Sequence, residues 1–161
     1  MTASTALEVV DSGNDDGSRL RGYHREIISG VGATRTLLAK ESGSICLFDR
    51  AAGVVYTLPT PVEGMTFDFA TTVTITSNAA KTITAAGTQF LLGTIFGYTT
   101  DITEIDGFEA NGSSITYISS NGSTTGGVIG DYYRLTALST TQWLITGHVF
   151  CGTSTPSTPF A

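Results

Sequence analysis

Residues 64–78, near the middle of the chain, alternate between apolar and polar side chains. Successive side chains of a strand point to opposite faces, so this pattern predicts a β-strand with one face toward a core. We expect a bend or bulge near residues 71–72, where the apolar face changes from aromatic to small side chains. The expected inward positions are Phe67, Phe69, Val73 and Ile75, and the expected outward positions are Asp68, Thr72 and Thr74.

The rest of the chain consists of short apolar or alternating runs separated by turns rich in Gly, Asn, Asp and Ser. Turn signals every eight to twelve residues are typical of an antiparallel sandwich or barrel. The sequence therefore predicts an all-β fold, an antiparallel β-sandwich of jelly-roll-like form, which would leave few free strand edges. Further strands are expected at residues 34–40, 45–48, 54–58, 81–85, 90–98, 101–109, 114–119, 131–138 and 142–150.

Three parts of the chain differ in composition. Residues 1–30 are expected to form an extended N-terminal arm, residues 31–150 a β-sandwich body, and residues 151–161 a proline-containing C-terminal tail. The arm contains the acidic, turn-rich stretch 11–18, which faintly resembles a calcium loop. That resemblance fails, because Gly13 occupies a ligand position and no Glu stands at the twelfth position.

The charge composition limits the partners of the chain. Only 14% of the residues are charged and the net charge is −6, which argues against sequence-independent binding of nucleic acid. No apolar run approaches the length of a membrane span, and no signal-peptide pattern opens the sequence. We therefore expect a protein made in a cytoplasm, with neither nucleic acid nor membrane as its partner.

No pattern of catalytic or metal-binding residues stands out. The histidines are His24 and His148, and neither lies in a motif typical of a catalytic triad. Cys46 and Cys151 each lie in an apolar run, so we expect buried free thiols and not nucleophiles or zinc ligands. The sequence predicts no enzyme, no cofactor and no metal site.

Two other groups of residues allow a functional reading but fit a structural one better. The acids Asp101, Glu104, Asp106 and Glu109 could include a glycosidase pair, yet adjacent acids on a strand and turn usually form a solvated face. Trp143 and the six tyrosines could form a sugar-binding platform. Trp143 lies in an alternating strand, so we expect it in the core.

Several short phrases resemble virion structural proteins of tailed bacteriophages, especially aquatic ones. The resemblance covers residues 40–161 and rests on Gly43-Ser-Ile-Cys-Leu-Phe-Asp49, Val54-Val-Tyr-Thr-Leu-Pro59, Gly64-Met-Thr-Phe-Asp-Phe69, Val73-Thr-Ile-Thr-Ser77, Trp143-x-x-Thr-Gly147 and a closing Pro159-Phe160. Within that group the chain is most similar to head-decoration, or cement, proteins. The resemblance implies a non-enzymatic protein on the outer capsid surface of the virion, made in the host cytoplasm, with the major capsid protein as its partner and a homotrimer as its state.

The arm and the tail supply the residues expected to contact the capsid. Arginines can bind carboxylates on the capsid surface in a bidentate manner, and apolar side chains add contacts that salt does not weaken. The expected capsid-binding residues are Arg19, Arg21, Arg25, Ile27, Ile28, Arg35 and Phe160. Two alternatives remain open: a tail-fibre or baseplate module that binds host glycans, and a carbohydrate-binding or hydrolytic β-domain.

Overall fold

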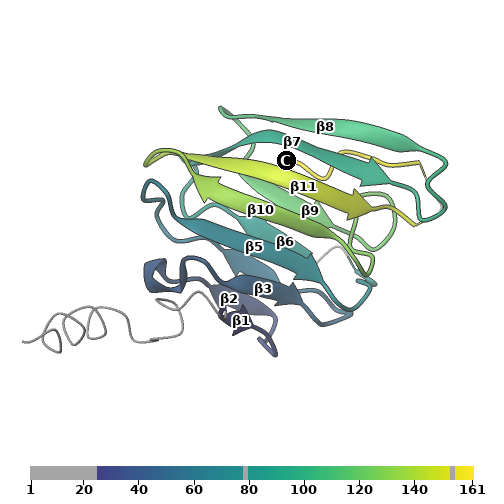
Figure 1. The fold of residues 1–161 in the computed structure, drawn as a ribbon, viewed down its shortest axis with the longest axis horizontal. Helices are drawn as coiled ribbons and strands as arrows, with labels where there is room; N and C mark the ends of the chain where they lie inside the picture. Colours follow the sequence, from purple (N-terminus) through teal and green to yellow (C-terminus); the bar gives the residue numbers. More distant parts are fainter. Residues whose placement is uncertain (1–24, 78–79, 153–154) are drawn as a thin grey trace, which may run out of the picture.

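Two β-sheets make up the fold of the described chain. The computed structural model describes residues 25–77, 80–152 and 155–161, which contain eleven strands, one 3-10 turn η1 (Ala39–Glu41) and no α-helix. The larger sheet has the order β1-β3-β5-β10-β11-β7-β8 (Figure 1). Its strands are β1 (Ile27–Ile28), β3 (Ile45–Phe48), β5 (Thr66–Thr71), β10 (Tyr132–Ala137), β11 (Gln142–Phe150), β7 (Phe90–Tyr98) and β8 (Ile105–Asn111). The smaller sheet consists of β2 (Thr34–Thr36), β4 (Val55–Thr57), β6 (Ala80–Ile83) and β9 (Tyr117–Ser120). The all-β prediction is confirmed.

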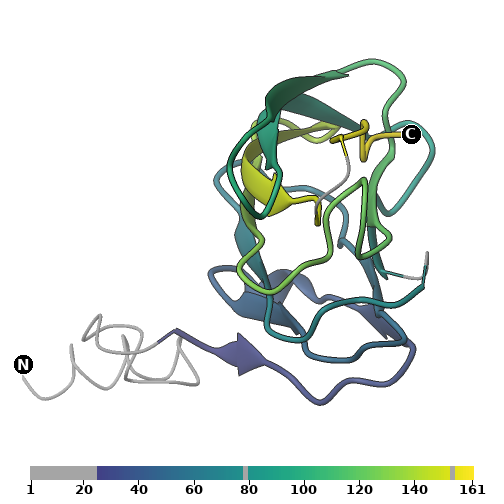
Figure 2. The same cartoon turned by 90° about the vertical axis from the view of Figure 1, so that its right-hand side faces the viewer.

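The two sheets lie as separate layers with the core between them (Figure 2). Tyr56 on β4 packs against Phe48 and Phe69 of the larger sheet, with ring centroids 5.4 and 5.6 Å apart. The hydroxyls of Thr82 on β6 and Tyr133 on β10 form a hydrogen bond of 2.7 Å across the same gap. Burial of these aromatic rings between the sheets stabilises the fold.

The expectation of antiparallel sheets is wrong. Among the described strands, five of the nine pairings are parallel: β1–β3, β3–β5, β2–β4, β4–β6 and β7–β11. For the first four of these pairings the reason lies in the path of the first six strands, which alternate between the two sheets. Each return to a sheet follows two crossings, so neighbouring strands run in the same direction. Both sheets are therefore mixed, and a jelly-roll arrangement is not confirmed.

Glycines turn the chain at the first four of these crossings. Gly30, Gly43, Gly53 and Gly64 have φ angles of +63°, +94°, +78° and +84°. These angles lie in the region that residues with a Cβ adopt only with strain. Each turn sends the chain across to the opposite layer, whereas a tight hairpin would return it beside the strand just completed.

The alternating stretch forms a shorter strand than its pattern suggests. Phe67, Phe69 and Ile75 are buried as predicted, with exposed fractions of 2% or less. Strand β5 ends at Thr71, close to the predicted bend, and the amides of residues 72 and 73 both donate to the Phe48 carbonyl. The ladder therefore stops, and Val73 is 36% exposed, so its predicted inward position is wrong.

The first and the last described segments of the chain both form hydrogen bonds with strands of the β-sandwich body. Residues 25–30, assigned to the arm from sequence, include β1, which pairs with β3 at the edge of the larger sheet. In the tail, Phe160 forms an antiparallel bridge with Ile118 of β9, and the Ser119 amide donates to the Pro159 carbonyl. The tail thus covers the outer edge of β9. The remainder of the predicted arm, residues 1–24, lies outside the described residues.

Candidate functional site

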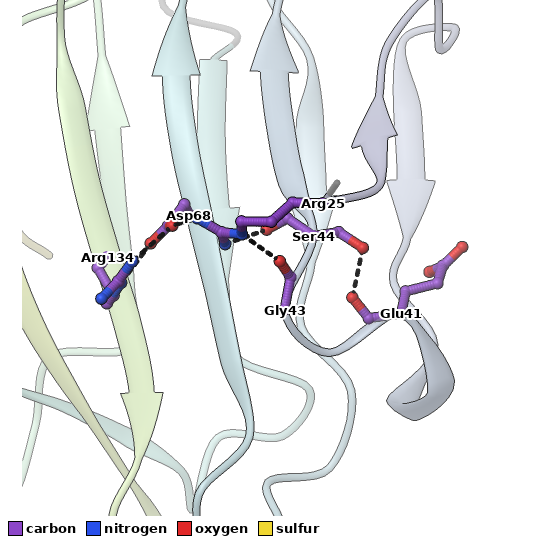
Figure 3. Close-up of polar contacts among 6 residues, drawn as sticks. All are labelled: Arg25, Glu41, Gly43, Ser44, Asp68 and Arg134. Atoms are coloured by element: carbon purple, nitrogen blue, oxygen red, sulfur yellow. Dashed lines mark hydrogen bonds and ion pairs between the residues drawn. The ribbon is translucent and has the colours of Figure 1, made fainter. Parts of the chain in front are cut away.

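A charged cluster lies on the outer face of the larger sheet, centred on Asp68 of β5 (Figure 3). Arg134 of β10 donates from Nε and Nη2 to the two Asp68 oxygens, at 2.6 and 2.9 Å. Arg25 binds the same carboxylate through Nη1. Its Nε and Nη2 donate to the carbonyls of Gly43 and Ser44, at 2.6 and 3.3 Å. The cluster therefore ties the segment before β1 to β3, β5 and β10.

The electrostatics of this cluster suit a structural role. Burial raises the pKa of the fully buried Asp68, but hydrogen bonds and charge from Arg134 and Arg25 outweigh it and hold that pKa below its usual range. In turn, the hydrogen bond to Asp68 raises the pKa of Arg134. An ionised carboxylate with three donors has no role as a proton acceptor at neutral pH. The sequence-based reading of Asp68 as an outward residue is right about its face, but the two arginines bury it.

Acid should weaken this cluster. The pKa of Asp68 is lower in the folded than in the unfolded chain, so its stabilisation is present above the ordinary Asp pKa and is lost as pH falls through the folded value. Below about pH 4, we expect the free energy of unfolding of the wild type to fall by about 1–2 kcal/mol more than that of Asp68→Asn. The difference is modest because solvent partly screens the charges of the two arginines. Urea melts at a series of pH values measure this difference.

The control for this experiment is Glu104→Gln, which removes an exposed carboxylate. This variant should lose stability in acid as the wild type does. An equally steep loss in Asp68→Asn would show that the carboxylate is not its source.

The residues predicted to contact a capsid differ in their exposure and in their contacts within the chain. Arg19 and Arg21 lie outside the described residues. Arg25 binds Asp68, and Arg35 forms an ion pair with Glu41, so both use part of their donor capacity within the chain. Ile28 and Phe160 are buried, with exposed fractions of 6% and 7%, whereas Ile27 is 51% exposed. Of the described members of this set, Ile27 offers an exposed apolar side chain.

The structure does not assemble the cysteines and His148 into a catalytic group. Cys46 and Cys151 are fully buried free thiols, as predicted. Burial raises the pKa of Cys46 to about 12 and that of Cys151 to about 11, so neither is a thiolate at neutral pH. His148 points to the outer face of β11, and its Nε2 lies 3.2 Å from the Gly130 carbonyl. Cys151 lies on the inward-facing side of the chain that continues β11.

Another buried carboxyl, Asp131, lies directly before β10. Burial raises the pKa of Asp131 to about 7. The carboxylate accepts hydrogen bonds from the amides of Phe150 and Gly127, at 2.7 and 2.5 Å, and these lower the pKa by less than burial raises it. Both oxygens are used by the backbone, and the residue is only 3% exposed. Asp131 therefore holds the loop before β10 against the end of β11 and offers no access to a substrate.

Five rings lie on the outer face of the larger sheet near the ends of β7 and β11. His148 lies 5.4 Å from Phe150, 6.2 Å from Tyr98 and 6.5 Å from Tyr132 between ring centroids. Phe96, opposite His148 in the ladder, is 48% exposed. We call Phe96, Tyr98, Tyr132, His148 and Phe150 the outer aromatic patch. Trp143 is not part of it, since it is fully buried against Phe67, as predicted.

Sequence reasoning missed the outer aromatic patch, although a signal was present. Positions 148 and 150 have the opposite parity to the inward residues of the same predicted strand, which places both rings outside. The four acids between residues 101 and 109 are exposed, in line with the solvated face expected for them. No group of three or more His, Cys, Asp and Glu residues that could hold a metal occurs in residues 25–77, 80–152 and 155–161.

Comparison with known proteins leaves the chain without an assigned relative. No family model matches it, and no match is found among curated proteins or among solved structures. In the part of the chain that the structure describes, no helix has the length and apolar character needed to cross a membrane. The function must therefore be argued from surfaces and their chemistry.

Proposed function

We propose that this protein is a non-enzymatic decoration, or cement, protein that binds the outside of an assembled phage head and stabilises the shell. The resemblance of residues 40–161 to virion proteins motivates the proposal. Its partner is then the major capsid protein, its state a homotrimer and its location the outer capsid surface. We class the two packed sheets as a β-sandwich, and the jelly-roll relation stays a prediction.

The observation that supports this function best is the outer aromatic patch. A protein that binds a lattice needs an apolar surface that its own chain does not cover. Phe96 is half exposed opposite His148 of this patch, and Ile105 on the neighbouring strand is 56% exposed. Large aromatic side chains carry most of the energy in many protein interfaces. The patch is therefore the contact that we assign to the capsid.

The test is binding of the full chain to empty capsids by co-sedimentation. Phe96→Ser should weaken binding about tenfold or more, because an aromatic hot spot contributes about 2 kcal/mol or more. The matched control is Val62→Ser, which removes a 59% exposed apolar side chain near Gly64. The Gly64 amide donates a hydrogen bond to the carbonyl of Ala137, which pairs with Trp143 of β11. Trp143 lies at the end of β11 opposite to the outer aromatic patch, so Val62 is remote from that patch. Wild-type binding by Phe96→Ser would contradict the proposal.

A glycan-binding module is the second candidate, and the same rings favour it. Aromatic faces bordered by polar groups bind sugars, and Tyr132 lies beside Arg134 on this face of β10. A glycan array with the wild type and Phe96→Ser separates the two functions. Patch-dependent glycan binding without capsid binding would replace the decoration role by the host-binding one.

A further inference from the structure

Strand β8 forms a long uncovered edge of the larger sheet. The sheet order places β8 at one edge and the two-residue β1 at the other, as Figure 1 shows. In the smaller sheet the tail covers β9, and β2 is three residues long. Among the described strands, β8 with its seven residues is therefore the main edge that can accept another strand.

The hydrogen-bond pattern shows which backbone groups of β8 point outward. At the two ends of the β7–β8 ladder, the Gly112 amide donates to Leu91 and the Thr99 amide donates to Glu104. Hydrogen-bonded pairs alternate along an antiparallel ladder, so the even-numbered residues of β8 bond to β7. The N–H and C=O groups of Ile105, Gly107 and Glu109 therefore face away from β7. No described residue pairs with them.

The charge at this edge selects the strand that it accepts. Asp101, Glu104, Asp106 and Glu109 are all exposed here. The sequence contains no Lys, Arg or His between Lys81 and Arg134 that could offset them. A second β8 strand would bring like charges together, which opposes pairing of this edge with itself. A basic extended segment fits both the free backbone groups and the charge.

We propose that β8 accepts the arginine-rich segment, residues 19–24, of a second copy of this chain as an added strand. The positive charges of Arg19 and Arg21 of the donor copy then complement the acids of the acceptor edge. This segment precedes β1, which is at the opposite edge of the same sheet. Copies placed side by side therefore extend the sheet head to tail.

This contact is separate from the one assigned to the capsid. An edge-to-edge contact leaves the outer face of the sheet free, so the outer aromatic patch can still bind a shell. The inference supplies a route to the self-association included in the proposed function but does not depend on the capsid. It gives Arg19 and Arg21 a partner different from the capsid surface expected from sequence.

The experiment is sedimentation velocity of the full chain without capsids over a range of concentrations. Gly107→Pro removes an outward N–H and places the ring at the free edge, where a strand tolerates proline. Gly107→Ala is its control, since it keeps that N–H and its added Cβ would meet the Phe96 ring at an ordinary distance of 3.6 Å. We expect the wild type and the alanine variant to self-associate alike, and the proline variant to need about tenfold or higher concentration.

Charge variants test the donor and keep the proposal falsifiable if the proline variant fails to fold. Arg19→Glu with Arg21→Glu, and Glu109→Lys alone, should each weaken self-association, and salt should weaken it in the wild type. A mixture of these two charge variants should associate better than either alone, because donor and acceptor charges are then complementary. A monomeric wild type, or undiminished association in a folded Gly107→Pro or in the charge variants, would overturn the inference.

Discussion

Replacing Phe67 with alanine should lower the free energy of unfolding by about 3–5 kcal/mol, because the ring is fully buried and its removal leaves a cavity. Phe67 lies at the centre of the larger sheet, in register with Leu135 of β10. Its ring packs against Trp143 with centroids 6.2 Å apart. Neither neighbour can move into the space without disturbing the ladder of a central strand, so little of the cavity should close. Urea denaturation monitored by circular dichroism measures the loss.

Thr74→Ala is the comparison for this variant. Thr74 lies beyond the end of β5, and its side chain is only half buried. Its Oγ1 accepts a long hydrogen bond of 3.4 Å from the Ile129 amide, so its loss should cost under about 1 kcal/mol. Equal losses in the two variants would mean that the assigned core face is wrong.

A single methyl group added at Gly93 should be nearly as damaging. Gly93 of β7 has a φ of +127° and lies opposite Ile145 in the parallel β7–β11 ladder. A Cβ there would overlap with the Ile145 carbonyl oxygen and lie 3.2 Å from Leu144 Cδ1. The overlapping atom belongs to the backbone of the adjacent strand, so the two strands must separate. We expect Gly93→Ala to destabilise the protein by about 3 kcal/mol or more.

Gly87→Ala adds the same methyl group in open space. Nothing lies within 4 Å of a Cβ built at Gly87, and its φ is not in the left-handed region. Its stability should stay within about 0.5 kcal/mol of the wild type. Thermal melts of both variants measure the contrast, and a mild effect of Gly93→Ala would show that β7 and β11 can separate at little cost.

Local patterns in the sequence located the strands well. The predicted runs 90–98 and 142–150 coincide with β7 and β11, because long apolar runs between turn residues specify an element by themselves. The predicted strand 34–40 is too long, because β2 ends at Thr36 and Lys40 lies in η1. Leu37 turns into the core there, whereas Leu38 is 48% exposed. Alternation over such a short stretch cannot show where pairing stops.

Strand direction and the candidate site depended on contacts between distant residues. Gly43 and Gly53 gave the same turn signal whether the chain was to reverse beside itself or cross to the other layer. The burial of Asp68 required Arg25 and Arg134, which are far from it in sequence. Side-chain parity was enough to place His148 and Phe150 outside, but their meeting with Tyr98 follows from the parallel pairing of β7 with β11. No local pattern encodes that pairing.

The position of the β10–β11 hairpin has a consequence for the order of folding. The larger sheet consists of two groups of earlier strands, β1-β3-β5 and β7-β8, and the hairpin is inserted between them. Each group can pair as soon as it leaves the ribosome, but the two groups share no strand neighbour until the hairpin exists. Contacts between residues so distant in sequence form slowly. The last long hairpin of the chain thus joins two half-sheets that were synthesised well before it.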